Sequence, residues 1–223
     1  MREVEAIAET TGKAIDASRE LGGFLKRYVS GPLDQISGMV EDGLKVMRWK
    51  RQIRLMDKAD EFMEARGLRS ATRPVPLRLA VPILQEGSLE EDDDLQDRWA
   101  RLLVNAADAN SGTEPRHAFV SILKDLTSLD AINLEKIYSI PLGKSAGVCT
   151  TGLPGEVYLE GRQGETLRED VATSLSNLSR LGLVSPPSVV DGGEALFEVH
   201  HTKLGSEFVK ACSAANHDSR AVS

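Results

Sequence analysis

Apolar residues recur at steps of three and four positions along most of the chain, and this spacing constrains the fold more than any other feature. That period matches the 3.6-residue turn of an α-helix, in which such residues share one face. The clearest stripe consists of Leu95, Trp99, Leu102, Leu103 and Ala106. Strand-like patterns are short, and the longest alternation covers residues 195–201. The sequence therefore predicts a mainly α-helical protein.

Glycine interrupts the helical pattern at the N-terminal end. Helical stripes run through residues 3–30 and 33–47, but glycines also recur there, at Gly12, Gly22, Gly23, Gly31, Gly38 and Gly43. A glycine inside a helix costs about 1 kcal/mol relative to alanine, so it usually serves close packing or marks a break. We expect residues 1–43 to form a Gly-rich amphipathic helical segment. Such a face packs on another helix, as in an oligomer, or lies on a membrane surface.

Residues 44–115 are predicted to form a helical core region. One strong helical pattern covers residues 44–66 and ends at Gly67, which is typical of a C-terminal cap. Pro82 is expected to kink or end the next helix. The segment Ser88-Leu-Glu-Glu91 matches a capping box and predicts the start of the helix that carries the Trp99 stripe.

Residues 116–212 alternate helical and extended patterns. A capping-box match at Thr166–Glu169 opens a helix that ends at Gly182, and a glycine turn and a closing helix follow. A loop or short hairpin is expected at residues 141–165. The order of elements resembles a winged-helix α+β domain with a small β-hairpin. Residues 213–223 are expected to form a disordered tail.

Many winged helices place a helix in the major groove of DNA. Here the predicted wing, residues 186–199, contains no Lys or Arg, although a DNA-binding surface must neutralise phosphates. We therefore favour a winged helix that faces protein or serves structure. DNA binding remains the alternative.

Charge is distributed unevenly along the chain. Residues 1–80 have a balance of +3 and residues 81–223 a balance of −10, within a total of −7. A basic block supplies the candidate anion- or partner-binding residues Lys45, Arg48, Lys50, Arg51 and Arg54. An acidic block occupies residues 86–97. The basic residues could clamp phosphates, pair with the acidic block or form a solvated face.

The motifs of common catalytic and metal sites are absent from the sequence. No phosphate-binding loop, dinucleotide fingerprint, nucleophile elbow, H-E-x-x-H or C-x-x-C is present. Two cysteines exclude a disulfide framework. His200 and His201 are adjacent on a predicted strand, so their rings point to opposite faces and cannot chelate one metal ion. We predict no catalytic residue, no metal site and no cofactor.

Composition and hydropathy predict a soluble, cytoplasmic protein. No stretch approaches the roughly 18–20 apolar residues of a transmembrane helix. The N-terminal residues also lack the apolar region of a signal peptide.

Five segments follow the order seen in the abortive infection alpha family of bacterial proteins. They begin at Leu44, Arg73, Ser88, Phe119 and Leu204, and the most distinctive one reads Ser88-Leu-Glu-Glu-Asp-Asp-Asp-Leu-Gln-Asp-Arg-Trp-Ala-Arg-Leu-Leu-Val-Asn105. The chain resembles this family over about residues 10–212. The resemblance implies a role in phage defence and supplies no catalytic residues.

Three functions remain open on these grounds. The first is a non-enzymatic interaction protein of abortive-infection defence, which contacts protein partners and self-associates through its N-terminal helices. The second is a nucleic-acid-binding winged-helix regulator that uses the basic helix. The third is a defence effector whose N-terminal amphipathic helices make peripheral contact with a membrane.

Overall fold

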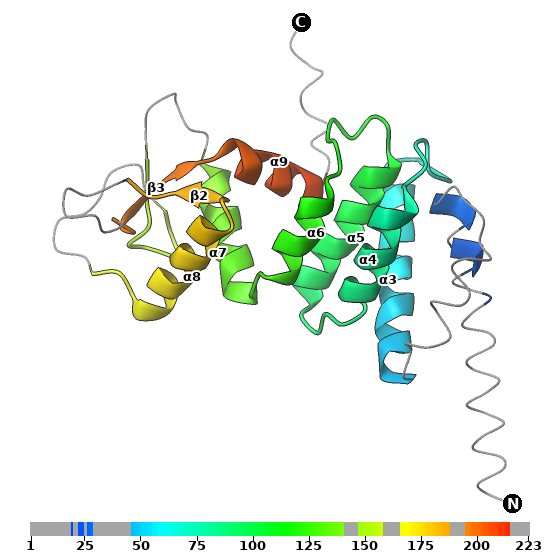
Figure 1. Ribbon diagram of the computed structural model, residues 1–223, viewed down its shortest axis with the longest axis horizontal. Coiled ribbons are helices and arrows are strands. Elements are labelled where there is room, and N and C mark those ends of the chain that lie inside the picture. Colours follow the sequence, from blue (N-terminus) through cyan, green and yellow to red (C-terminus); the bar gives the residue numbers. More distant parts are fainter. Residues whose placement is uncertain are drawn as a thin grey trace, which may run out of the picture. The chain divides into compact units, whose positions relative to one another are not determined.

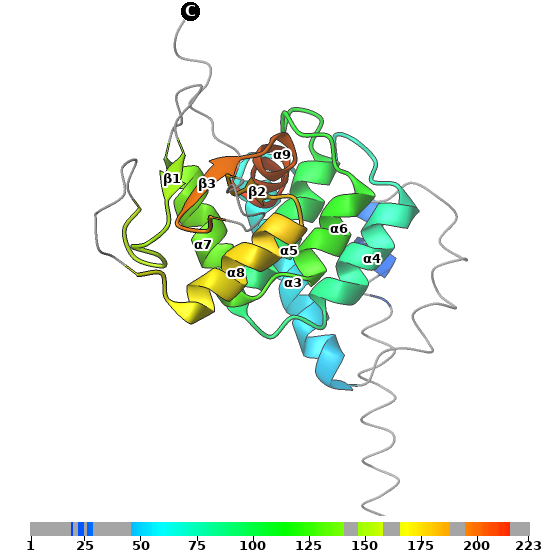
Figure 2. The same cartoon turned by 60° about the vertical axis from the view of Figure 1, so that its left-hand side comes forward.

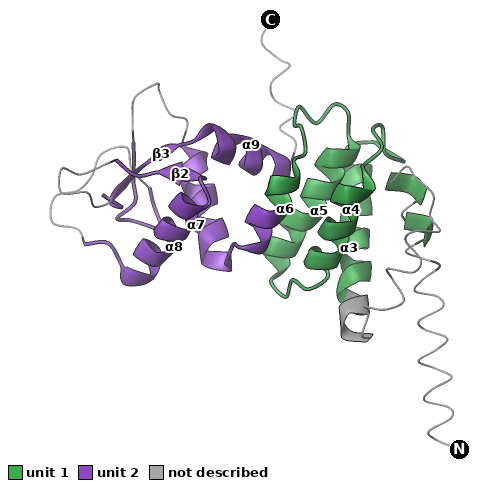
Figure 3. Ribbon diagram, viewed as in Figure 1, with its two compact units in different colours: residues 1–120, 215–223 green, residues 121–214 purple. Residues whose placement is uncertain are grey.

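The computed structural model describes residues 19, 22–24, 26–28, 46–140, 147–157, 166–187 and 195–214. These residues are mainly helical, with a small three-stranded antiparallel sheet near the C-terminal end, which confirms the predicted fold class (Figure 1). The predictions for residues 1–43 and for the tail fall largely outside them. The chain divides into two compact units, one reaching Val120 and the other comprising Ser121–Ala214 (Figure 3).

The first unit contains the helices α3 (Val46–Ala65), α4 (Leu77–Gly87) and α5 (Asp93–Ala107). α6 (His117–Lys124) begins in this unit and ends in the second. α3, α4 and α5 pack against one another. The predicted apolar stripe of α5 is buried in this unit, and Trp99 is 1% exposed.

Gly67 ends α3 as predicted. Its φ angle is +70°, and Leu68 N donates to Met63 O over 3.0 Å across the end of the helix. Only glycine adopts this left-handed conformation without a steric penalty, so the helix stops where the sequence indicates.

The following segment corrects two details: Pro82 does not end its helix, and Ser88 does not cap the next one. Pro82 lies inside α4, which continues to Gly87. The missing N–H removes one hydrogen bond, but burial of the apolar face of α4 outweighs that loss. The N-cap of α5 is Asp92 rather than Ser88: its carboxylate accepts from Asp94 N and Leu95 N, whereas Ser88 Oγ donates to Gln85 O at the end of α4.

The second unit contains α7 (Ser128–Ser139), α8 (Glu169–Arg180) and α9 (Lys203–Cys212). Its strands are β1 (Val148–Cys149), β2 (Val184–Ser185) and β3 (Glu198–His201). Figure 2 shows the sheet, in which β3 lies between β1 and β2. Val148 pairs with Val199, and Val184 with His201. Of the region predicted as a loop or short hairpin, Val148 and Cys149 therefore join a strand about 50 positions away, and residues 141–146 and 158–165 lie outside the described residues.

The two helices α7 and α8 of this unit begin with different caps. Thr127 caps α7 in a complete capping box with Asp130. Thr166 does not cap α8, because that helix begins at Glu169 and its N-cap, Arg168, makes no side-chain capping bond. Gly182 ends α8 as predicted, with φ at +72°.

Candidate functional site

The structure places the described part of the basic block against the acidic block. Lys45 lies outside the described residues, as do the side chains of Arg48 and Lys50. Arg51 Nη2 lies 2.6 Å from Glu91 Oε1, and Arg54 pairs with Asp93. One turn further along α3, Lys58 pairs with Asp97. We call these three pairs the α3–α5 ladder.

The ladder follows from the local spacing of the two blocks. Residues three or four apart share one face of a helix, so Arg51, Arg54 and Lys58 form a single row on α3. The residue numbers of the acidic partners rise in the same order as those of the basic residues. α3 and α5 therefore run in the same direction along this contact. Gln96 Nε2 also donates to Arg51 O over 3.1 Å. The ladder thus fixes the register between the two helices.

Electrostatics keep the middle pair of the ladder, Arg54 and Asp93, charged. The hydrogen bond from Arg54 lowers the pKa of the Asp93 carboxyl below its ordinary value, and the same bond raises the pKa of Arg54. Burial lowers the pKa of Lys58, and the charge of Arg54 adds to this effect. The Glu91 and Asp93 side chains are 78% and 66% exposed, so water and salt screen these pairs.

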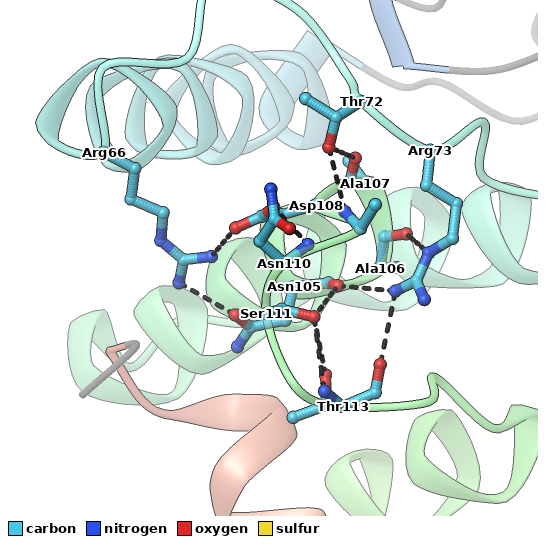
Figure 4. Close-up of polar contacts among 11 residues, drawn as sticks. Arg66, Thr72, Arg73, Asn105, Ala106, Ala107, Asp108, Asn110, Ser111 and Thr113 are labelled. Atoms are coloured by element: carbon cyan, nitrogen blue, oxygen red, sulfur yellow. Dashed lines mark hydrogen bonds and ion pairs between the residues drawn. The ribbon is translucent and has the colours of Figure 1, made fainter. Parts of the chain in front are cut away.

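A second polar cluster surrounds the C-terminal end of α5 (Figure 4). The last carbonyls of a helix have no partner within the helix. Arg73 supplies such partners: its Nε donates to Ala106 O and its Nη2 to Asn105 O, each over 2.9 Å. Its backbone N–H donates to Ala107 O over 2.9 Å. Arg73 therefore joins the segment before α4 to the end of α5.

Arg66 completes this cluster from the end of α3. Its Nη1 lies 3.3 Å from Asp108 Oδ2, and its Nη2 donates to Asn105 Oδ1 over 2.8 Å. The two charged side chains are only 9% and 8% exposed. An ion pair withdrawn from water in this way holds the fold only while both partners remain.

Sequence reasoning missed Arg66, Arg73 and Asp108 as partners. Arg73 gave one usable signal, because it is a charged residue at the start of an otherwise apolar, proline-rich segment. Arg66 and Asp108 gave none, since they lie 42 positions apart and no local spacing connects them.

The second unit has its own polar centre at Tyr138. The hydroxyl of Tyr138 donates to Leu183 O over 2.6 Å and accepts from Thr202 N over 3.1 Å. Burial raises the pKa of this hydroxyl. The ring of His201 stacks on Tyr138 with centroids 4.0 Å apart, and His201 Nε2 lies 2.9 Å from Ile137 O.

The adjacent His200 has different surroundings, since its Nε2 lies 3.7 Å from Glu198 Oε1. The two rings thus contact different groups, as expected for neighbours on a strand. Within the described ranges, no group of three or more His, Cys, Asp or Glu residues could hold a metal ion.

A helix that spans a membrane needs about 20 apolar residues. No helix in the described part of the chain is long and apolar enough to cross a bilayer.

Comparison with known proteins gives one result. The family model described as abortive infection alpha matches residues 50–212, more than half of the chain. No curated protein and no solved structure matches significantly. The matched range contains the α3–α5 ladder, the cluster around Arg66 and Arg73, and the Tyr138 centre. The chain therefore belongs to the abortive infection alpha family.

Proposed function

We propose that this chain is a non-enzymatic interaction protein of abortive-infection defence, which acts in the cytoplasm through protein contacts and self-association. Membership of the abortive infection alpha family supports the defence role. The ion pairs of the basic side chains support an action through protein contacts. Arg51 and Arg54 are paired with carboxylates of their own chain, and this observation carries the proposal.

The same argument applies to the helix that precedes the β2–β3 pair. Arg180 Nη2 of α8 lies 3.1 Å from Asp125 Oδ2, and Arg168 pairs with Asp170 at the start of the helix. A phosphate would have to compete with these carboxylates for each guanidinium. Compensated arginines favour a surface that meets protein over one that meets a nucleic acid backbone.

Exposed apolar side chains of the second unit support protein contacts. Phe197, at the turn before β3, is 57% exposed, and Ile132 and Leu204 are 42% and 37% exposed. Aromatic side chains are enriched at protein interfaces. Phe197 is therefore the first residue to test.

The experiment is a phage challenge of cells that produce the chain or its variants. Phe197→Ser should raise the phage yield toward that of cells without the protein, while the purified variant keeps its circular dichroism spectrum. Lys203→Ser is the matched control, since Lys203 is also exposed, with 86% of its side chain accessible. Light scattering on the wild-type chain should give more than one chain per particle. A monomeric wild type, or full defence by Phe197→Ser, would contradict the proposal.

One observation favours the alternative of a nucleic-acid-binding regulator. The strand order β1-β3-β2, with α8 directly before the β2–β3 pair, supports a winged-helix assignment for the second unit. Salt-dependent binding to duplex DNA distinguishes the two functions. Under our proposal the chain shows no binding at low salt. Binding that is lost on charge reversal of Arg48, Arg51 and Arg54 would favour the regulator.

A further inference from the structure

A short helical segment near the N-terminal end contacts the rest of the first unit through two aromatic rings. Residues 22–24 and 26–28 are helical. Phe24 and Tyr28 are each 2% exposed, and their rings stack with centroids 4.4 Å apart. Lys26 and Arg27, between them, are exposed. One face of this segment is therefore buried against the unit.

Polar contacts fix the position of the same segment. Tyr28 Oη donates to Asp60 Oδ1 over 3.0 Å, and Arg27 pairs with the other oxygen of that carboxylate. Two backbone bonds add to these: Val75 N donates to Tyr28 O over 3.0 Å, and Ala71 N to Arg27 O over 3.3 Å. We call the surface formed by Asp60, Ala71 and Val75 the docking surface.

The docking surface and the segment belong to different parts of the sequence. The docking surface lies within the family match, whereas residues 22–28 precede it. Residues 29–45, 17 in number, connect the segment to α3. A chain of that length spans up to about 60 Å when extended. The connection therefore allows the segment to reach the docking surface of another copy as well as its own.

Exchange between copies costs little because every contact is reproduced. The side chains of the Arg27–Asp60 pair are 47% and 39% exposed, so water weakens this ion pair. An element held by few bonds opens at a lower free energy than the core of its unit. Once open, it could make the same hydrogen bonds to Asp60, Ala71 and Val75 of a second chain, because that chain presents the same groups.

We propose that this chain self-associates by exchange of the helical segment that contains residues 22–24 and 26–28, so that Phe24, Arg27 and Tyr28 of one copy occupy the docking surface of a second copy. The inference rests on the self-association in the proposed function and names its partner and its contact surface. Each docking surface then binds the Phe24, Arg27 and Tyr28 side chains of the other chain.

Cross-linking of two differently tagged chains tests this exchange. One chain carries Lys26→Cys and the other Ala71→Cys, and the mixture is treated with a short bis-maleimide. Lys26 is next to Arg27, whose carbonyl oxygen accepts a hydrogen bond from the backbone N–H of Ala71. Neither substitution removes the side-chain contacts of Arg27 and Tyr28 with Asp60. The native Cys149 and Cys212 are buried, and each single variant mixed with the wild type gives the background. We expect a covalent heterodimer that carries both tags.

Two further variants establish that the segment makes the contact. Phe24→Ala, added to the Lys26→Cys chain, should reduce the heterodimer at least tenfold, because it removes a buried ring. Gly23→Ala is the matched control, since a methyl group at Gly23 meets nothing within 4 Å. It should leave the yield unchanged.

The outcomes separate this inference from the function that it extends. A chain with both cysteines that links only to itself, while the mixed chains stay unlinked, overturns the exchange. If light scattering still shows a dimer in that case, self-association uses another surface and the proposed function stands. If the wild type is monomeric, both fail.

Discussion

The ion pair between Arg66 and Asp108 links the ends of α3 and α5 with both side chains more than nine-tenths buried. Asp108→Ala removes one partner and leaves a guanidinium in a poorly hydrated site. Loss of one partner of a buried pair costs about 3–5 kcal/mol. We expect urea denaturation to show a decrease of that size in the free energy of unfolding.

An exposed pair serves as the control for this prediction. Arg168 and Asp170 are 60% and 48% exposed, and water solvates both groups when they separate. Asp170→Ala should therefore lower the free energy of unfolding by much less than Asp108→Ala does. Equal losses in the two variants would show that burial does not govern the Arg66 pair.

The pair between Arg54 and Asp93 makes a prediction about pH. Arg54 holds the pKa of the Asp93 carboxyl below its ordinary value of 3.8. A lowered folded-state pKa stabilises the fold above that ordinary value, and this contribution disappears as the pH falls through the lowered one. Arg54→Gln should raise the pKa of Asp93, as measured by an NMR titration of its carboxyl carbon. The pKa of Asp170, set mainly by Arg168, should not move; an unchanged Asp93 would refute the assignment.

At the scale of the element, two threonines test which capping box exists. Thr127 accepts a hydrogen bond from Asp130 N over 3.2 Å at the start of α7, whereas Thr166 precedes the N-cap of α8 by two positions. Thr127→Ala should cost about 1 kcal/mol. Thr166→Ala should change the stability by less than about 0.5 kcal/mol. Thermal unfolding of both variants checks this, and a reversed order of the two losses would restore the sequence-based assignment.

The packing of α9 depends on a residue without a side chain. A methyl group at Gly205 would overlap the Tyr138 hydroxyl and the Leu183 carbonyl oxygen, so α9 could not keep its distance from α7 and β2. Gly205→Ala should lower the stability by about 1–3 kcal/mol through overpacking. The measurement is denaturant unfolding. Gly23→Ala, in a helical and open position, should be neutral or slightly stabilising, and similar losses in both would contradict the packing argument.

The elements that the sequence predicted best are those with purely local causes. The stripe around Trp99 and the caps at Gly67 and Gly182 depend on residues within one or two helical turns. The errors in the predicted N-caps also have a local cause. The capping-box spacing occurs at Ser88 and Thr166, but neither residue lies at the N-cap position of its helix. The pairing of β1 with β3 depends on contacts about 50 positions apart, and no periodicity encodes them.

The candidate site follows the same division. The charge blocks that form the α3–α5 ladder were visible in the sequence, but whether they paired with each other or with phosphates depended on helix packing. The roles of Arg66 and Arg73 could be recognised only in the folded chain, because their partners lie at the end of α5. Local composition thus located the charges, and tertiary structure determined their partners.

At the scale of the whole molecule, each of the two units has buried apolar residues and a polar centre of its own. The contacts of Asp108 lie within the first unit and those of Gly205 within the second. Hydrogen exchange with mass spectrometry should therefore show that Asp108→Ala accelerates exchange in residues 46–107 and spares residues 166–187. Gly205→Ala should have the opposite effect, because local unfolding follows the element that loses its packing. If either variant accelerates exchange equally in both ranges, the units unfold as one cooperative body, and the destabilisation of one would then transmit to the surfaces of the other.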